Sequence, residues 1–458
     1  MYVISSEQSV FDLHGCEGWE ITSVRKEKAD MATEMMEKVL SEENLEEAKR
    51  KVMSNKGSAG VDKMTVFELP NYIEEHGEEL CEAIRGRRYR PLPVRRVQIP
   101  KDDGSKRNLG VPAVRDRWIE QAVCQQLTPI FEKEFSNYSY GFRPGRKAEQ
   151  AVTKALEYMN EGYDWIVDLD LSKFFDYVNQ DILMILVHKV IKDPDVESLV
   201  RRFLQGGVLV EGIFEETKVG TAQGSPISPL LANIYLNEFD KELETRGLRY
   251  TRYADDCIIC VKSEMAANRV MNTVTKWLHE HLRVEVNATK TKVGRPNDIK
   301  YLGFGFYRQK MEWRPKPHKK SIKKLEYKLK PLLKRNWGVS MEYRMKKINE
   351  VTRGWINHYR IADMKTEMKR IDKKIRLHIR ICYWKQWKTV KNRAKHLYFL
   401  GMPKYWCWLY ANTRKGLYRS GKWLGRWITN KLLKQKGLLS LAVHYAKVHT
   451  NQQPMLEL

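Results

Sequence analysis

The sequence predicts an α+β fold in which a split βαβ sheet is followed by a long α-helical region. Two observations predict the sheet: an apolar stretch at 165–170 that ends in carboxylates, and two short apolar stretches within 250–261 that fold back about an acidic pair. The third observation is the mainly helical period of the apolar residues after about residue 312. Strand, helices, hairpin, helix and strand is the element order of a split βαβ sheet, which would bring the carboxylates onto neighbouring central strands.

Short helices and a hairpin are expected before the sheet. Residues 1–30 show no clear period, whereas 31–54 have the apolar spacing of short amphipathic helices. The cluster NKGSAG at 55–60 is rich in turn formers but lacks the Gly-Lys-Ser/Thr ending of a phosphate loop, so we interpret it as structural. Residues 94–111 predict a β-hairpin with its turn at 102–105.

The elements of the sheet region follow from the spacing of their apolar residues. The run WIVDLD at 165–170 is typical of a buried strand, and helices are expected at about 181–191 and 229–246. Residues 250–261 predict two short strands joined at the acidic pair.

A capped helix and a last strand are expected next. Ser263 is a candidate N-cap for a helix with one apolar face, formed by Val270, Val274, Trp277 and Leu278. The alternation of apolar and charged residues over 282–286 predicts a strand.

The positive charge is concentrated in the last third of the chain. The 458 residues carry 82 Lys and Arg and 57 Asp and Glu, a net charge of +25, but residues 301–458 alone hold 39 basic and 8 acidic residues, a net +31. The same third holds nine of the 13 Trp. Basic side chains interleaved with aromatic ones suit a nucleic acid, since cations bind phosphates and rings stack on bases. The alternative is a helical domain whose Trp side chains lie in the core and whose Lys and Arg are merely solvated. For any single Trp a core position is favoured, whereas the net charge of the region favours a polyanionic partner.

Composition excludes several classes of protein. Hydrophobic residues make up 42% and aromatic residues 10% of the chain, which is typical of a folded globular protein. Membrane spans and secretion are not expected, because no run of eighteen apolar residues exists and the N-terminus lacks the regions of a signal peptide. Seven irregularly spaced Cys predict no disulfide framework and favour a reducing cytoplasm. Cys257 and Cys260 would face opposite sides of a strand, which argues against a metal site there.

Candidate metal-binding carboxylates are Asp170 and the adjacent pair Asp255 and Asp256. Two acids between apolar strands are unfavourable unless a divalent cation neutralises them. Oxygen ligands favour Mg²⁺ over Zn²⁺, and two Mg²⁺ ions bridged by carboxylates form the standard clamp for phosphoryl transfer. Asp168 shares a strand face with Asp170, so position alone does not choose between them, and a polar surface turn is the alternative for 255–256.

Nine motifs follow one another along the chain: YRP at 89–91, IPK at 99–101, RNLGVP at 107–112, YGFRPG at 140–145, DLSKFFD at 170–176, QGSPISP at 223–229, YADD at 253–256, YLGF at 301–304 and GWIN at 354–357. Together they resemble bacterial group II intron-encoded reverse transcriptase/maturases over about 31–450, most of all the compact class without an endonuclease domain. The resemblance implies a right-hand polymerase with fingers and a ferredoxin-like split βαβ palm, followed by an α-helical thumb/maturase domain.

The resemblance also implies a division of the chain: an unassigned N-terminal extension at 1–30, fingers with an N-terminal extension motif at 31–160, the palm with the catalytic aspartates at 161–312, a helical thumb/maturase domain at 313–400 and a basic DNA- or RNA-binding region at 401–458.

The family's catalytic roles transfer onto matching residues. Asp170, Asp255 and Asp256 would be the catalytic carboxylates, and Leu171 would join them as a metal ligand. The first two aspartates would hold the metals most directly, which leaves Asp168 in a supporting role.

The nucleotide-binding roles transfer in the same way. Phe175 would be the steric gate that leaves no room for a 2′-hydroxyl, and Gln223 would line the nucleotide pocket. Lys101 and Arg107, facing each other across the hairpin, would grip the triphosphate. Lys290 would be a candidate proton donor to pyrophosphate, with an ordinary surface lysine as the alternative.

Two features differ from the family's fuller pattern. Ala222 precedes Gln223 where the family usually has Pro, so the pocket loop is expected to be slightly looser. No His-Asn-His nuclease motif with Cys pairs follows about residue 400, so cleavage of DNA for priming is expected to come from elsewhere, such as nicks or replication forks.

The expected function is RNA-directed DNA synthesis with two Mg²⁺ ions, or Mn²⁺ in their place, together with binding of a group II intron RNA for splicing and mobility. The expected partners are the RNA template, a DNA primer or target and dNTPs, in the bacterial cytoplasm at the nucleoid and without a membrane. Three alternatives stay open: a splicing-only maturase, an RNA-dependent RNA polymerase (which Phe175 disfavours), and a domesticated reverse transcriptase in repair or phage defence.

Overall fold

The structure is a computed structural model, and it describes residues 33–450 apart from 101–103, 105 and 211. The described residues divide into two units, each assembled from separate stretches of the chain. Unit 1 takes its residues from 33–135, 173–239 and 280–284, and unit 2 from 136–172, 240–279 and 285–450. Because both units are interleaved in sequence, the contiguous division into fingers, palm and thumb stays a prediction.

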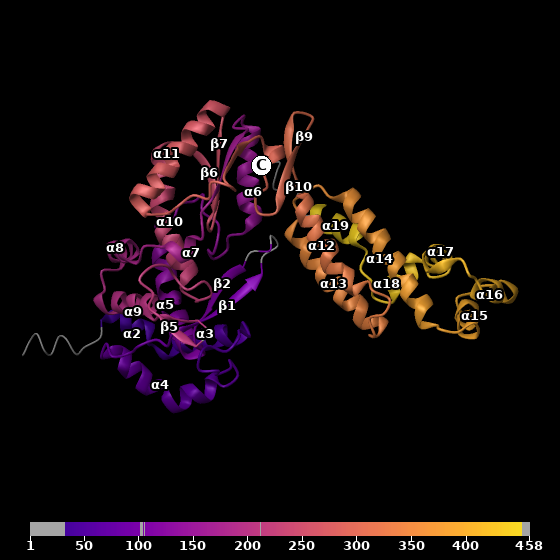
Figure 1. Cartoon of the computed structure of the whole chain (residues 1–458), viewed down its shortest axis with the longest axis horizontal. Helices are drawn as coiled ribbons and strands as arrows, with labels where there is room; N and C mark the ends of the chain where they lie inside the picture. Colours follow the sequence, from indigo (N-terminus) through magenta and orange to yellow (C-terminus); the bar gives the residue numbers. More distant parts are fainter. Residues whose placement is uncertain (1–32, 101–103, 105, 211, 451–458) are drawn as a thin grey trace, which may run out of the picture. The chain divides into compact units, whose positions relative to one another are not determined.

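Unit 1 is built around helix α5 and a small mixed sheet (Figure 1). Strands β1 and β2 form the expected antiparallel hairpin, and β4 pairs in parallel with β1, which gives the order β2-β1-β4-β5. Helix α5 is buried along most of its length, and the indole of its Trp118 donates a hydrogen bond to the Leu45 carbonyl at 2.9 Å. The elements of the unit are α2 (Glu34–Val39), α3 (Glu42–Ser54), α4 (Leu69–Arg85), β1 (Val94–Pro100), β2 (Lys106–Val111), α5 (Val114–Phe131), α7 (Phe174–Tyr177), α8 (Gln180–Ile191), α9 (Pro194–Gln205), β4 (Val208–Val210), β5 (Ile213–Glu215) and the first part of α10 (Ser228–Thr245).

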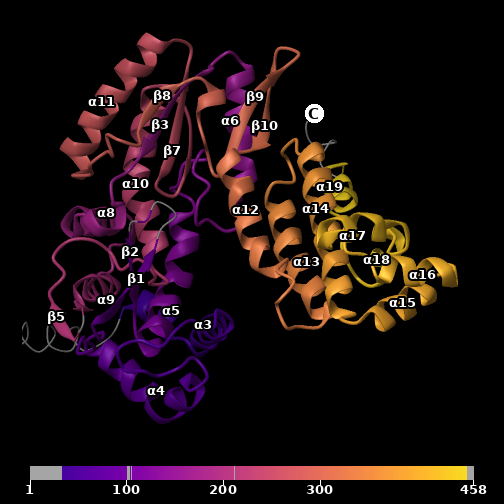
Figure 2. The same ribbon diagram turned by 45° about the vertical axis from the view of Figure 1, so that its right-hand side comes forward.

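Unit 2 contains the expected split βαβ sheet. Its strand order is β6-β7-β3-β8 and all neighbouring pairs are antiparallel, so β3 and β6 run parallel on either side of β7. This is the ferredoxin-like arrangement of two interleaved βαβ units, in which α10 leads into β6 and α11 follows β7. Figures 1 and 2 show α11 on one side of this sheet and α6 on the other. The elements are α6 (Ala148–Asn160), β3 (Trp165–Asp170), β6 (Arg249–Tyr253), β7 (Asp256–Val261), α11 (Glu264–Leu282) and β8 (Lys292–Gly294).

The strand predicted at 282–286 is wrong. Helix α11 continues through Leu282, because Leu282 extends the i+4 series of Val270, Val274 and Leu278, all four of which are buried. Arg283 then adopts a left-handed conformation (φ +53°) that ends the helix. Only an isolated bridge at Val286 remains of the predicted strand, and the edge strand of the sheet is β8 instead. The predicted cap is present, since Ser263 Oγ accepts a hydrogen bond from the Ala266 N–H at 3.3 Å.

The rest of unit 2 is a hairpin followed by helices, which confirms the helical pattern expected there. One apolar core runs from α6 and the sheet into the helices after residue 318. The Trp residues of this region are of two kinds, since Trp384 and Trp387 are buried in the core while Trp406 and Trp408 are 46% and 53% exposed. The elements are η1 (Pro296–Asp298), β9 (Phe304–Gln309), β10 (Glu312–Pro317), α12 (Lys319–Leu332), α13 (Met341–His358), α14 (Lys365–Gln386), α15 (Val390–Phe399), α16 (Lys404–Ala411), α17 (Gly416–Trp423), η2 (Leu424–Arg426), α18 (Asn430–Gln435) and α19 (Leu441–Thr450). Within the described part of the chain, no helix is both long and apolar enough to span a membrane.

Candidate active site

The predicted catalytic carboxylates of unit 2 lie where β3 ends and β7 begins. Asp170 is the last residue of β3 and stands directly opposite Asp256, the first residue of β7. Asp255 lies in the tight turn before β7, where Tyr253 pairs with Asp256. Leu171 follows β3 directly and is buried. The structure therefore brings together the three aspartates that are separated by up to 86 positions in sequence.

The clustering of these carboxylates disfavours their ionised forms. Desolvation, followed by repulsion from Asp255 and Asp170, raises the pKa of Asp256 to about 6. Desolvation, Asp256 and Asp170 raise the pKa of Asp168 to about 7, and the nearby Lys292 lowers it only in part. A bound divalent cation would relieve this repulsion.

The carboxylate oxygens of these aspartates suit a hard divalent cation that also has ligands from a substrate. The clustered side chains offer only carboxylate oxygens, which Mg²⁺ and Mn²⁺ prefer. Across the described residues, no group of three or more His, Cys, Asp or Glu side chains is arranged to hold a metal by itself. Mg²⁺ commonly binds through one or two carboxylates together with substrate phosphates, and the pair at Asp170 and Asp256 suits that mode.

Lys290 lies at the same end of β3. Its Nζ is 3.4 Å from each carboxylate oxygen of Asp170. The segment that carries it is fixed to the end of β3, because the Asn287 N–H donates to the Asp170 carbonyl and the Ser172 N–H donates to the Glu285 carbonyl, both at 2.8 Å. Lys290 is also exposed, so its role as a proton donor stays a prediction, and so does the alternative of an ordinary surface lysine.

A buried ion pair supports the acidic turn, and sequence reasoning missed it. Arg252 is 1% exposed and donates hydrogen bonds to both carboxylate oxygens of Asp240, at 2.7 and 2.5 Å. It also donates to the carbonyl of Ala254 at 2.9 Å, and Ala254 holds the turn's left-handed conformation at φ +58°. Gly141 packs against the same turn, because a Cβ there would lie 2.2 Å from the Ala254 nitrogen. The available signal was an arginine in the predicted strand directly before the acidic pair.

The predicted nucleotide-pocket residues of unit 1 share one backbone scaffold. The half-buried Phe175 on α7 accepts a hydrogen bond at its carbonyl from the Thr221 N–H at 2.8 Å. The Gln223 carbonyl accepts from the Gly110 N–H at 2.8 Å, which joins the pocket loop to β2. Gly224 (φ +130°) allows this approach, because a Cβ there would lie 2.3 Å from the Gly110 carbonyl oxygen. Within unit 1, Phe175, Gln223 and the strand of Arg107 are thus held by the same loop.

The hairpin register places only one of the two residues predicted to grip the triphosphate. The residue directly opposite Arg107 is Ile99, and the expectation that Lys101 and Arg107 face each other stays a prediction. Lys101 itself lies outside the described residues.

A buried glutamate holds the pocket loop, and sequence reasoning missed this contact too. Ser225 Oγ donates to Glu120 Oε2 at 2.7 Å, and burial raises the pKa of Glu120 to about 8. The carbonyl of Ala222 accepts from the Ser225 N–H at 3.1 Å and from Ser228 Oγ at 2.8 Å. These bonds restrain the loop at the position where the family usually has Pro. The available signal was a glutamate among the apolar residues of 118–123.

Two family models match the chain. Residues 99–306 match the family described as reverse transcriptase (RNA-dependent DNA polymerase), and residues 322–400 match the group II intron, maturase-specific domain. These matches confirm the resemblance that the motifs indicated.

Curated relatives agree with both family models. Protein YkfC of Escherichia coli is 33% identical over 59% of this chain and 81% of its own length. The group II intron-encoded protein LtrA of Lactococcus lactis is 32% identical over 56% of this chain, and the putative COX1/OXI3 intron 2 protein of Saccharomyces cerevisiae is 27% identical over 58%. The match spans 54% of LtrA and 38% of the yeast protein. With a polymerase motif set at the strand ends, a maturase-specific domain and these relatives, the chain belongs to the family of group II intron-encoded reverse transcriptase/maturases.

Proposed function

We propose that the protein is an RNA-directed DNA polymerase that copies group II intron RNA into cDNA and binds that RNA to assist splicing and mobility. One observation supports the catalytic part most strongly: the direct pairing of Asp170 with Asp256 beside the Asp255 turn, in a chain of the reverse transcriptase family. A cluster of carboxylates is typical of a site that binds divalent cations together with the phosphates of a substrate.

In this proposal Asp170, Asp255 and Asp256, with the carbonyl of Leu171, hold two divalent cations, Mg²⁺ or Mn²⁺. The chemistry that the ions supply when bound is activation of a primer 3′-hydroxyl and stabilisation of the charge on the α-phosphate and pyrophosphate. Lys290 contributes a positive charge next to Asp170 and donates a proton to the leaving pyrophosphate.

The residues of unit 1 select the nucleotide in the same proposal. The ring of Phe175 excludes a ribose 2′-hydroxyl, and its position is held from two sides by the Thr221 hydrogen bond and by edge contact with the ring of Phe174. Arg107, and Lys101 with it, bind the triphosphate, and Gln223 lines the nucleotide pocket.

The basic last third binds the RNA. Its net charge of +31 over 158 residues supplies sequence-independent attraction to phosphates, and the maturase-specific match at 322–400 lies within it. We expect the protein to act at the bacterial nucleoid, where a DNA primer or target is available.

Primer extension tests the proposal. The wild-type protein should extend a DNA primer on an RNA template with dNTPs and Mg²⁺, and Asp255→Ala should abolish extension while RNA binding is retained. Asp298→Asn, which removes an exposed charge of the same unit outside the acidic turn, is the matched control and should extend normally. Synthesis by the Asp255→Ala protein would refute the site, and an inactive wild-type protein that still promotes intron splicing would show a splicing-only maturase.

A further inference from the structure

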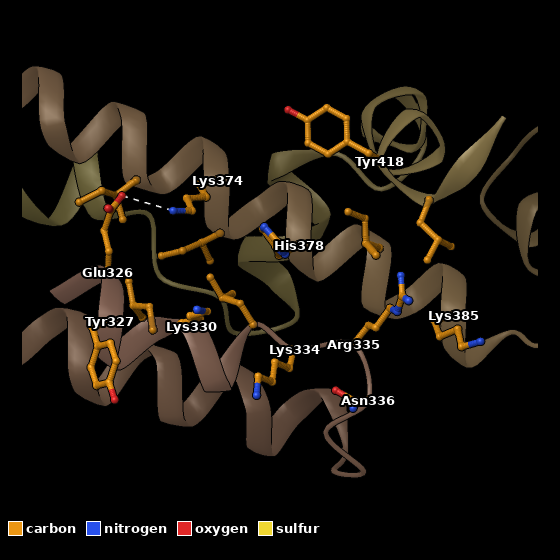
Figure 3. Close-up of a pocket in the computed structure, with 16 residues that line it drawn as sticks. Glu326, Tyr327, Lys330, Lys334, Arg335, Asn336, Lys374, His378, Lys385 and Tyr418 are labelled. Atoms are coloured by element: carbon orange, nitrogen blue, oxygen red, sulfur yellow. Dashed lines mark hydrogen bonds and ion pairs between the residues drawn. The ribbon is translucent and has the colours of Figure 1, made fainter. Parts of the chain in front are cut away.

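A cavity of about 1040 Å³ lies between helices α12, α14 and α17 of unit 2 (Figure 3). Its floor is apolar, since it is formed by the buried side chains of Leu329, Leu333, Ile371 and Ile375. The volume is at the upper end of the range for small-molecule sites in proteins. The cavity can therefore accept a flat, mainly apolar group about the size of a nucleobase together with its sugar.

The rim of this cavity is strongly basic. Lys330, Lys334, Arg335 and Lys385 are all exposed there, and within the described part of the chain no carboxylate forms an ion pair with any of them. The one carboxylate in the lining, Glu326, is already neutralised by Arg370 at 2.9 Å and by Lys374 at 3.4 Å. Four positive charges thus lack an internal partner, and a bound anion would supply one.

An aromatic ring and a neutral imidazole complete the lining. Tyr418 is 57% exposed, and Figure 3 shows its ring at the edge of the cavity. The Nζ of Lys422 lies 4.9 Å from the centre of this ring and covers one of its faces, so a base could stack on the other. Burial and the nearby Lys374 lower the pKa of His378, and a hydrogen bond with the Leu333 backbone opposes this only in part. The uncharged imidazole is therefore favoured at pH 7, and its other ring nitrogen can accept a hydrogen bond from a ligand.

The loop that carries two of the rim cations is held rigid from beneath. Arg344 is 1% exposed and donates to the carbonyls of Lys334 at 2.8 Å and Trp337 at 2.7 Å. Its guanidinium also lies 5.0 Å from the ring centre of Trp337. Lys334 and Arg335 therefore stand on a fixed backbone, which lowers the entropic cost of binding a ligand at the rim.

We infer that this cavity binds one unpaired nucleotide of a single-stranded RNA segment, with the base over the apolar floor beside Tyr418 and the flanking phosphates on Lys330, Lys334, Arg335 and Lys385. The inference rests on the proposed RNA-binding function and specifies the kind of RNA that binds at this cavity. Sequence-specific RNA recognition by proteins commonly targets bases that are splayed out of loops and bulges, and rings and cations bind them. A duplex would leave the apolar floor unused, because its bases are stacked inside the helix. An acidic peptide would complement the positive charges of the rim, but its carboxylates would not stack on the exposed ring of Tyr418.

Binding of short RNAs to the full chain tests the inference. The probes are a fluorescently labelled single-stranded RNA octamer, rA8, and a labelled blunt RNA duplex of twelve base pairs, both titrated at several salt concentrations. The test variants are Tyr418→Ala and the double variant Lys330→Gln/Lys385→Gln. The matched control is Lys369→Gln/Lys373→Gln, which removes the same charge from exposed lysines of α14 that do not line the cavity.

Tyr418→Ala should weaken rA8 binding at least about 5-fold, the low end of one base's stacking contribution, and leave duplex binding unchanged. Lys330→Gln/Lys385→Gln should weaken rA8 binding more than the control pair does, and crosslinking of a 4-thiouridine-substituted octamer should map to the peptide containing Tyr418. Equal losses in the test and control pairs, with Tyr418→Ala unchanged, would overturn the inference in favour of non-specific attraction. If AMP displaces rA8 at equal concentration, the inference is overturned and the cavity is a site for free nucleotides. If only polyglutamate displaces rA8, the inference is overturned in favour of an acidic protein partner.

Primer extension on a pre-annealed template separates this inference from the proposed function. If the two test variants extend the primer normally and lose only rA8 binding, the cavity is the site for the unpaired RNA nucleotide and the polymerase assignment is unaffected. If the wild-type protein binds rA8 and the duplex equally and crosslinks elsewhere, the cavity assignment fails while the polymerase assignment stands.

Discussion

The buried pair of Arg252 and Asp240 gives the sharpest stability prediction. Asp240 is fully buried, and Arg252 satisfies both of its carboxylate oxygens. Replacing Arg252 with Met would leave a buried, unpaired carboxylate, which costs about 3–5 kcal/mol. The variant would also release the Ala254 carbonyl, which Arg252 holds at the acidic turn, so polymerase activity should fall together with stability.

The partly exposed pair of Arg246 and Glu242 is the control. These residues lie at the end of α10, their nitrogen and oxygen atoms are 2.7 Å apart, and their side chains are 29% and 27% exposed. Because solvent screens this pair, Arg246→Met should cost less than about 1 kcal/mol. The double variant Arg252→Met/Asp240→Leu should recover much of the lost stability, since it removes the uncompensated charge.

Hydrogen exchange is the suitable assay, because a chain with two units is not expected to unfold in one step. A loss of 3 kcal/mol corresponds to exchange about 100-fold faster, and we expect it at the amides of β6 and β7 in the Arg252→Met protein. Unchanged exchange in these strands, or an effect as small as that of Arg246→Met, would refute the argument that this ion pair supports the turn.

Three further predictions concern single residues. Because the pKa of Glu120 is raised to about 8, the folded chain keeps a proton there that the unfolded chain loses above pH 4.5, so this group's contribution to stability falls as pH rises from about 4.5 to 8. Glu120→Gln keeps an acceptor for Ser225 and cannot ionise, so its stability relative to the wild type should increase by up to about 5 kcal/mol between pH 5 and pH 8.5. Hydrogen exchange at the amides of α5, corrected for the intrinsic effect of pH, measures this; a difference that does not change with pH would contradict it. Phe175→Ala should raise the ratio of ribonucleotide to deoxynucleotide incorporation, measured as kcat/KM, by about tenfold or more, and an unchanged ratio would exclude the steric gate. Lys290→Gln should lower single-turnover incorporation about 100-fold with little change in dNTP affinity, as loss of a proton donor near Asp170 requires; full activity would leave Lys290 without a catalytic role.

The sequence predicted the strands that position the aspartates, because their signals are local. The run at 165–170 begins with three apolar residues after Asp164 and ends in a carboxylate, and its predicted ends agree with β3. The acidic pair at 255–256 separates two apolar stretches, so the hairpin of β6 and β7 also followed from pattern. Long helices with a regular apolar face, such as α11 and α14, were predictable for the same reason.

The missed features depend on contacts between distant residues or on very short elements. Strands β4, β5 and β8 have three residues each, which is too few to show a period. The strand expected at 282–286 failed because apolar positions that alternate can also continue an i+4 helical series. The buried partners of Asp240 and Glu120 lie on other elements, so the local sequence could show a charged residue among apolar ones but not the residue that binds it.

Metal-directed cleavage tests the central claim most directly. Fe²⁺ that occupies the site of Mg²⁺ and reacts with peroxide should cut the backbone near both Asp170 and Asp255 of the protein bound to primer–template and dNTP. The cuts should disappear with excess Mg²⁺ and in Asp256→Asn, and they should persist in Asp298→Asn. Cleavage at only one of the two segments, or cuts that Mg²⁺ does not suppress, would contradict a shared metal site at the ends of β3 and β7.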